Sequence, residues 1–309
     1  MSETVFLVNP AAANGATGRR WPEFAHQAAG VGLEGDALIS EHRGHLGVLA
    51  REAAAGGARL LVVVGGDGAL NEVANGIADL DDPPAVALIP SGTGGDFVRT
   101  FGIPNDVAEA ARIALDGETT TVDLGRIGYR AWDGGDATAV FANVASAGMS
   151  GAIAQRANDT SKALGAKASY LWATLAVFRG WSAVETALTV DDESRSGKMF
   201  DVVVANGRFF GGGMKMCPDA VPDDGLFDVV TIGDVTKRDL VMTMPKIYRG
   251  THLPHPKAEA LRGRVVTVET AEPVPVELDG EQPGTTPARF DVLPGALRLR
   301  VPASTQETA

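Results

Sequence analysis

Residues 62–72 read VVVGGDGALNE and carry the clearest structural signal in the chain. A run of apolar, β-branched residues predicts a buried parallel strand at 59–64, and helical spacing predicts a helix at 70–78. The glycine-rich turn between them can adopt positive φ and lets a ligand come close to the backbone. The N-terminus of the following helix presents free N–H groups and a partial positive charge to an anion. The stretch therefore predicts a strand–turn–helix unit that can bind phosphate.

One acid, Asp67, lies inside this glycine-rich turn. A carboxylate repels a phosphate group, so its presence favours a Mg²⁺ ion between the carboxylate and the phosphates. A tight turn in which Asp67 only caps a helix is the plain structural alternative.

A second loop of similar design follows the next predicted strand, at 85–89, and reads PSGTGGDF over residues 90–97. It again places an acid, Asp96, among glycines at the start of a predicted helix. Because the carboxyl ends of parallel strands lie at one edge of a sheet, where ligands bind, we expect both loops there. A third acid, Asp123 in the sequence VDLG, either joins this site or only caps a strand-end turn.

Strands and helices alternate from the N-terminus to about residue 128, which implies a parallel sheet with helices on both faces. The first strand, at 4–9, ends in the loop NPAAANG at residues 9–15. That loop either contacts phosphate or substrate or is an ordinary turn. We predict a Rossmann-like α/β nucleotide-binding domain over residues 1–128, with a further strand at 36–40 and helices at 20–30, 45–55, 96–101 and 107–115.

The pattern changes after residue 128, where turn clusters separate longer strand-like runs. We predict a β-rich, β-sandwich-like second domain over residues 129–290, so that the whole chain is α/β plus β. Two helices interrupt this domain, at 162–178 and 237–248. The strand-like runs are 138–147, 185–190, 199–205, 227–232, 265–269 and 274–278, followed by 289–293 and 297–301.

Composition limits the partners and the location of the protein. The net charge of −12 and the pI near 4.9 argue against nucleic-acid binding and against standing attachment to anionic membranes through basic residues. Transient lipid contact through apolar surface remains open. The N-terminus lacks the pattern of a secretory signal, and one cysteine, Cys217, cannot form an internal disulfide. We expect a cytoplasmic protein.

Several motifs, taken in order, resemble the catalytic domain of diacylglycerol kinases and sphingosine-type lipid kinases. The resemblance spans residues 5–301 and is greatest to the soluble bacterial members. The motifs are NP at 9–10, GGDG at 65–68, PSGTGGDF at 90–97, FANVASAG at 141–148, NG at 206–207, GGG at 211–213, PDAVPDDGLFD at 218–228, GTHLPHP at 250–256 and LDGE at 278–281.

The resemblance implies an ATP- and Mg²⁺-dependent kinase that phosphorylates the hydroxyl of diacylglycerol or a similar lipid. It implies transient contact with the membrane surface that holds this lipid, and the sequence leaves a homodimer open. It also implies that the C-terminal strands, at 291–302, return to the first domain.

The same resemblance implies roles for individual residues. Asp67, Asp96 and Asp123 would surround the catalytic Mg²⁺, and Glu281 would be the general base on the lipid hydroxyl. A second, structural Mg²⁺ would be held by Asp224 with the carbonyl groups of Val221 and Leu226. The residues expected to bind the nucleotide are Asn9, Ser40, Gly65, Gly66, Asp67, Gly68, Ala69, Leu70 and Thr93.

Two positions depart from the family pattern, which usually has Thr where this chain has Ala69 and Asn where it has Gly95. One alternative is therefore an inactive lipid- or nucleotide-binding homologue. Another is a kinase of a soluble acceptor such as NAD, which would share the glycine-acid-glycine motif. Asp279-Gly280-Glu281 has its own plain alternative, a hairpin turn, because Asp-Gly favours one.

Overall fold

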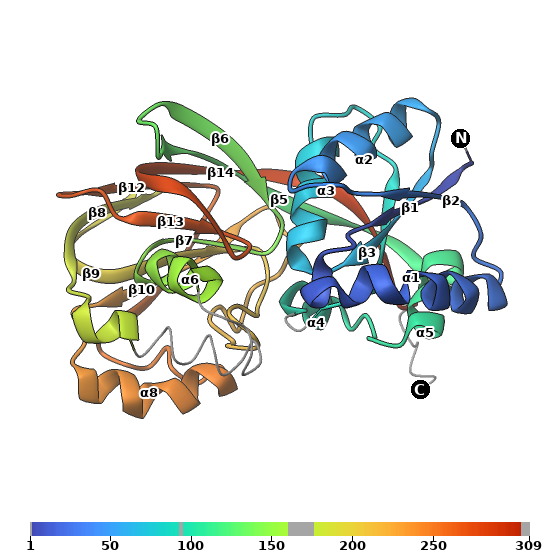
Figure 1. Cartoon of the computed structure of the whole chain (residues 1–309). Coiled ribbons are helices and arrows are strands. Elements are labelled where there is room, and N and C mark those ends of the chain that lie inside the picture. Colours follow the sequence, from blue (N-terminus) through green and yellow to red (C-terminus); the bar gives the residue numbers. More distant parts are fainter. Residues whose placement is uncertain (1, 93–94, 160–175, 304–309) are drawn as a thin grey trace, which may run out of the picture. The chain divides into compact units, whose positions relative to one another are not determined.

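The computed structural model describes residues 2–92, 95–159 and 176–303. The chain divides into two compact units, and each is described by itself (Figure 1). The first unit comprises Met1–Val122 and Gly295–Ala309, and the second comprises Asp123–Pro294. The divisions fall inside two long strands, β5 (Glu118–Ala131) and β14 (Glu281–Val301), which continue from one unit into the other.

The first unit is built on a parallel sheet in the order β2-β1-β3-β4-β14. The β3 strand pairs on both sides, and its residues 61–64 are almost fully buried, as the apolar run predicts. The connection from β1 runs outward to β2, and the chain then returns to β3 on the other side of β1. This reversal places the carboxyl ends of β1 and β3 at a topological switch point, where α/β proteins bind ligands. The first four strands are β1 (Thr4–Val8), β2 (Asp36–Ile39), β3 (Leu60–Gly65) and β4 (Ala85–Pro90).

Helices cover both faces of this sheet, with α1 and α5 on one face and α2 and α3 on the other (Figure 1). Phe24 and Ala28 of α1 and Ala110 of α5 pack on the inward side chains of β1, β3 and β4. On the other face, α2 and α3 cross at Gly47 and Gly76, where a Cβ on Gly76 would come within 2.3 Å of the Gly47 carbonyl oxygen. The helices are α1 (Ala12–Gly30), α2 (His45–Ala55), α3 (Asp67–Ile77), α4 (Asp96–Phe101) and α5 (Val107–Asp116).

The α1 helix starts earlier than the predicted range of 20–30, but its first turn is irregular. Ala13, Asn14 and Gly15 all have positive φ. The regular helix therefore starts after these residues, and the end of the predicted loop at 9–15 is non-helical in the structure.

Antiparallel strands dominate the second unit. The strands β9, β8, β12, β14, β13 and β7 pair in that order, and β7 pairs with β9 to close the circuit. Buried residues such as Phe141, Val204, Phe227 and Phe290 fill one core cluster of this unit. The strands are β6 (Asp136–Phe141), β7 (Val144–Gly148), β8 (Val184–Val190), β9 (Glu193–Ala205), β10 (Phe227–Gly233), β11 (Ala258–Gly263), β12 (Val265–Thr270) and β13 (Pro275–Leu278), with parts of β5 and β14.

Helices α6 (Met149–Asp159) and α8 (Lys237–Arg249) belong to the second unit. Residues 160–175, which hold most of the predicted helix at 162–178, lie outside the described residues, and residues 176–180 are helical. Among the described residues, no helix is long and apolar enough to cross a membrane.

The predicted single strand at 138–147 is wrong, since the structure divides it into β6 and β7. Asp279 provides the physical reason. Its carboxylate accepts hydrogen bonds from the backbone N–H groups of Ala142, Asn143 and Val144, at 2.7, 3.0 and 3.0 Å. The two strands are separated at the segment that this carboxylate binds.

Candidate active site

Three loops of the first unit follow β1, β3 and β4 and are linked by hydrogen bonds. The N–H of Asn9 donates to the carbonyl of Val64 at 3.0 Å, and the N–H of Ser91 donates to the carbonyl of Gly65 at 2.8 Å. The hydroxyl groups of Thr17 and Ser91 lie 2.6 Å apart. The two glycine-acid loops and the first loop therefore form one connected edge, as the parallel sheet predicts.

The turn after β3 needs glycine because of close packing. A Cβ on Gly65 would come within 2.6 Å of the Cβ of Ala69, which is itself buried. Gly66 caps α3 without a side-chain hydrogen bond. Since the first N–H groups of a helix have no acceptor inside it, the α3 N-terminus supplies donors suited to an anion.

Asp67 is the first residue of α3, yet its carboxylate caps a different helix. Its Oδ2 accepts from the N–H of Asp96 at 3.0 Å, and its Oδ1 accepts from the N–H of Phe97 at 3.3 Å. Burial raises the pKa of Asp67, while these N–H groups and the charge of Arg99 oppose the rise. The first N–H groups of α4 are thus bound by Asp67.

Asp96 lies beside Asp67 because of this cap, and its side chain is buried. The guanidinium of Arg99 approaches Asp96 Oδ1 at 3.4 Å. The residue before it, Gly95, has a φ of +66°, in the left-handed region. Glycine and asparagine both adopt that region readily, so Gly95 in place of asparagine preserves the backbone of the loop.

A pocket of about 330 Å³, counting the part open to solvent, lies between the two glycine-acid loops. Of the residues predicted to bind nucleotide, Gly65, Gly66, Asp67 and Leu70 line it, together with Ser91, Gly92, Gly95 and others.

Three other predicted nucleotide residues, Ser40, Asn9 and Gly68, do not line this pocket. Ser40 is buried after β2, and its N–H donates to Val8. The side-chain oxygen of Asn9 accepts from the N–H of Ala11 at 3.1 Å. Gly68 follows Asp67 in the first turn of α3. Thr93 lies outside the described residues.

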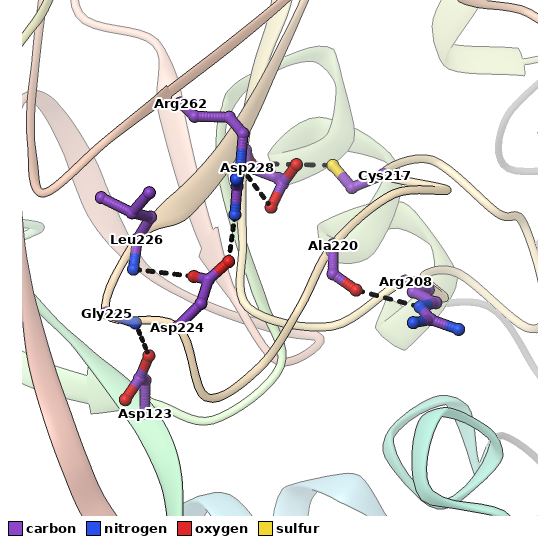
Figure 2. Close-up of polar contacts among 9 residues, drawn as sticks. All are labelled: Asp123, Arg208, Cys217, Ala220, Asp224, Gly225, Leu226, Asp228 and Arg262. Carbon is purple, nitrogen blue, oxygen red and sulfur yellow. Dashed lines mark hydrogen bonds and ion pairs between the residues drawn. The ribbon is translucent and has the colours of Figure 1, made fainter.

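In the second unit, Asp123 organises the loop at 218–228 (Figure 2). Its Oδ2 accepts from the N–H of Gly225 at 2.7 Å, and its own N–H donates to the carbonyl of Pro222 at 2.8 Å. The Asp123 carbonyl accepts from the Asn206 side chain at 3.2 Å. Asp123 is only 2% exposed, so it is part of the structural support of this loop.

Both oxygens of Asp224 already have a partner. Oδ1 accepts from the N–H of Leu226 at 3.0 Å, and Oδ2 pairs with the guanidinium of Arg262 (Figure 2). The Nε of Arg262 also lies 3.4 Å from Oδ2 of Asp228. Burial raises the pKa of Asp228, and the positive charge of Arg262 opposes that rise.

The carboxylates of both predicted magnesium sites already have partners in the protein. Among the described residues, no group of three histidine, cysteine, aspartate or glutamate side chains could hold a metal ion. Mg²⁺ commonly uses one or two carboxylates together with phosphate oxygens, and Asp67 and Asp96 supply two carboxylates here. In this structure the N–H groups of α4 bind Asp67, and Arg99 lies beside Asp96. At the predicted structural site, Asp224 likewise pairs with an arginine, so an ion there would have to displace Arg262.

The turn with the predicted base lies between β13 and β14. Asp279 has a φ of +47° and, as described above, accepts three backbone hydrogen bonds. Beneath it, the fully buried Glu277 accepts from the N–H of Gly280 and, at 3.2 Å, from the hydroxyl of Ser146. Burial, with the nearby charge of Asp279, raises the pKa of Glu277 well above its usual value. Glu281, the first residue of β14, thus follows a turn that the hydrogen bonds of Asp279 and Glu277 hold in place.

Sequence reasoning missed Glu277 and Arg262. In the run VPVE, strand alternation places Glu277 on the face opposite the buried Val274 and Val276, so the pattern gives no signal for a buried acid. No local signal marks Arg262, because its partners, Asp224 and Asp228, are more than thirty residues earlier in the chain.

Two family models match the two parts of the chain, and related proteins match most of its length. The family described as Diacylglycerol kinase catalytic domain matches residues 3–127, and the family described as YegS C-terminal NAD kinase beta sandwich-like domain matches residues 143–301. A protein named "Diacylglycerol kinase" from Staphylococcus carnosus (strain TM300) is 26% identical over 302 residues, covering 98% of this chain and 96% of that protein. A protein named "Probable lipid kinase YegS-like" from Pseudomonas aeruginosa is 36% identical over 260 residues, covering 82% of this chain and 80% of that protein.

A crystal structure of a diacylglycerol kinase from Bacillus anthracis str. Sterne shares the fold, with a TM-score of 0.71 at 22% identity over 96% of each chain. The predicted two-domain architecture with a β-sandwich-like second domain is confirmed by the two family matches. The resemblance to diacylglycerol kinases, predicted from the sequence motifs, is confirmed as well. The chain is therefore a kinase and belongs to the diacylglycerol kinase family of lipid kinases.

Proposed function

We propose that this kinase transfers the γ-phosphate of ATP to the hydroxyl of a lipid, with diacylglycerol as the first acceptor to test. The observation that supports it best is the pocket between the two glycine-acid loops, with the α3 N-terminus and Asp67 in its wall. Phosphoryl transfer depends mainly on positioning and charge neutralisation, and such a loop supplies donors for phosphate oxygens.

The glycine-rich turn and the first turn of α3 would bind the phosphates of ATP. Asp67 and Asp96 would hold the Mg²⁺ that accompanies them, and Asp123 remains a proposed third ligand. When bound, this ion neutralises charge on the phosphates. The buried methyl group of Ala69 supplies no hydroxyl, and the N–H of Ala69 donates to the Gly66 carbonyl, so the N–H groups of the residues before Ala69 would bind the phosphates.

Glu281 would act as the general base. Its carboxylate would take the proton of the lipid hydroxyl as the hydroxyl oxygen attacks phosphorus. Asp279 and Glu277 would act as positioning residues, because their hydrogen bonds fix the turn in which Glu281 lies. The acceptor is proposed from the names of the relatives, which are a diacylglycerol kinase and a lipid kinase.

The test measures ³²P transfer from labelled ATP to diacylglycerol, sphingoid bases and ceramide in mixed micelles, and to NAD in solution. Wild type should label a lipid, and Glu281→Gln should lower the rate by about 100-fold or more. Glu272→Gln, which removes an exposed acid nine residues earlier, is the matched control and should stay within about twofold of wild type.

Transfer to NAD without transfer to any lipid would overturn the proposal of a lipid acceptor. ATP binding with no transfer at all would support an inactive homologue. Equal losses in Glu281→Gln and Glu272→Gln would exclude Glu281 as the base.

A further inference from the structure

The α8 helix is a well-built element of the second unit, drawn in orange in Figure 1. Its N-terminus has a capping box, in which the Thr236 hydroxyl accepts from the N–H of Asp239 at 3.2 Å and the Asp239 carboxylate accepts from the N–H of Thr236 at 2.9 Å. Leu240 and Ile247 are buried on its inner side. A capped helix anchored in this way presents its outer side chains in a fixed pattern.

The outer face of α8 exposes apolar side chains. Val241 is 62% exposed and Met242 is 65% exposed, which makes them the two most exposed large apolar residues of the described chain. Pro245 is also exposed and lies on the same face by its spacing of four and three residues from them. Apolar side chains gathered on one face are a common sign of an interaction surface.

Basic residues surround this apolar group. Lys237, Arg238, Lys246 and Arg249 are all exposed, and Asp239 is the one acid of the helix. Four basic residues and one acid give the helix a charge of +3, in a chain with a net charge of −12.

The helix dipole explains only half of this pattern. It favours Lys246 and Arg249 in the last turn, but it disfavours positive charge at the first two helical positions, Lys237 and Arg238. We define the α8 face as Lys237, Arg238, Val241, Met242, Pro245, Lys246 and Arg249.

We propose that the α8 face docks the protein on a bilayer that contains anionic lipid. The inference rests on the proposed function, because a lipid acceptor is held in such a bilayer. A helix with basic residues around exposed apolar residues is suited to the membrane interface, where the cations meet anionic headgroups and the apolar side chains enter the boundary. The charge of +3 on α8 complements the anionic headgroups of such a bilayer.

The test uses the full chain and flotation with vesicles of phosphatidylcholine alone or with phosphatidylglycerol. Wild type should bind the anionic vesicles, and binding should weaken as salt rises. Replacing Lys237, Arg238, Lys246 and Arg249 by glutamine should weaken binding by about 100-fold or more, because four losses of about fivefold each multiply. Val241→Ser with Met242→Ser should weaken it about fivefold or more at high salt, where charge contributes less.

A matched control removes four exposed cations from other parts of the chain, Arg59, Arg112, Lys198 and Arg264, each replaced by glutamine. It gives the same net charge as the first variant and should bind within about twofold of wild type. Equal weakening in this control, or no weakening in the α8 variants, would overturn the proposal. Wild type that fails to bind anionic vesicles, or α8 variants that change only the oligomeric state, would also overturn it.

Kinase assays separate this proposal from the proposed function. With a short-chain, water-soluble diacylglycerol, the α8 variants should match wild type, while with vesicle-embedded substrate they should lose at least about tenfold. Vesicle binding without any lipid phosphorylation would leave the α8 face supported and overturn the function instead.

Discussion

At the scale of single residues, Asp201 shows how burial changes the pKa of a carboxyl group. It lies in β9, where its Oδ2 accepts from the N–H of Ser150 at 3.1 Å and from the Ser150 hydroxyl. Its Oδ1 is buried and has no hydrogen-bond partner among the described residues. Burial raises the pKa of Asp201 to about 7. The folded protein therefore keeps this group protonated where the unfolded chain, with a pKa near 4, loses the proton.

This difference predicts a pH dependence of stability. Between about pH 4 and pH 7 the folded state binds the extra proton, so the contribution of Asp201 to the free energy of unfolding falls as pH rises through this window. Asp201→Asn should remove that contribution, so that the variant gains stability relative to wild type between pH 5 and pH 8. Urea unfolding at both pH values checks this, and parallel pH curves for the two proteins would contradict it.

Local patterns predicted some residues of the site but not others. Asp67 and Asp96 were found because each follows a buried strand and sits among glycines. Their mutual arrangement, with one carboxylate capping the helix of the other, was not predictable, because it depends on how two loops pack. Arg262 and Asp201 carry no local signal, since the neighbours that define them are distant in the sequence.

At the scale of elements, the N-terminus of α4 depends on a residue outside that helix. Asp67 bonds two of its N–H groups, so the capping role and the proposed catalytic role belong to one side chain. Asp67→Ala should lower the free energy of unfolding by about 0.5–2 kcal/mol, the usual loss for a helix cap. Asp67→Asn keeps one acceptor oxygen and should cost less. Both variants should lose about 100-fold or more in lipid phosphorylation, because neither holds a charge.

Asp106 is a matched control for the Asp67 variants, because it caps α5 by accepting from the N–H of Glu109 at 2.9 Å. Asp106→Ala should lose comparable stability and keep its phosphorylation rate per folded molecule. Denaturant unfolding measures the stability, and the ³²P assay on the same preparations measures the phosphorylation rate. Full activity in Asp67→Asn would show that Asp67 is a structural cap only.

Elements with a strong apolar period were predictable, and the others were not. The β3 strand and helices α2, α4 and α5 lie within a residue or so of their predicted ranges. The β5 and β11 strands were missed because threonine, arginine, glycine and alanine dilute their apolar pattern. The start of β14 was missed for a related reason, since it contains Pro283 and Gly284, which usually mark turns.

At the scale of the whole molecule, the first unit is discontinuous. Its sheet includes residues from the end of β14, where Leu299 pairs with Val86 of β4. Leu297 and Leu299 are fully buried, and the guanidinium of Arg300 donates to the carbonyl of Gly117 at 2.6 Å. A chain that stops after Val122 would leave β4 as an unpaired, apolar edge.

We therefore predict that residues 1–122 alone do not form a stable monomer. Joining residues 295–303 to this fragment through a flexible linker should restore cooperative unfolding and a monomeric elution volume. Circular dichroism and gel filtration of the two fragments check this. A fragment of residues 1–122 that is monomeric and unfolds cooperatively would contradict it.

The return of β14 also bears on how the protein is made. A ribosome produces the chain from its N-terminus, so β1 to β4 emerge early and wait for their last neighbour. Every residue of the second unit, Asp123–Pro294, leaves the ribosome before that neighbour does. Domains usually fold in the order of synthesis, but here the unit that is started first is the one that is finished last. During translation, the β4 edge that pairs with β14 therefore stays unpaired until the end of the chain has been made.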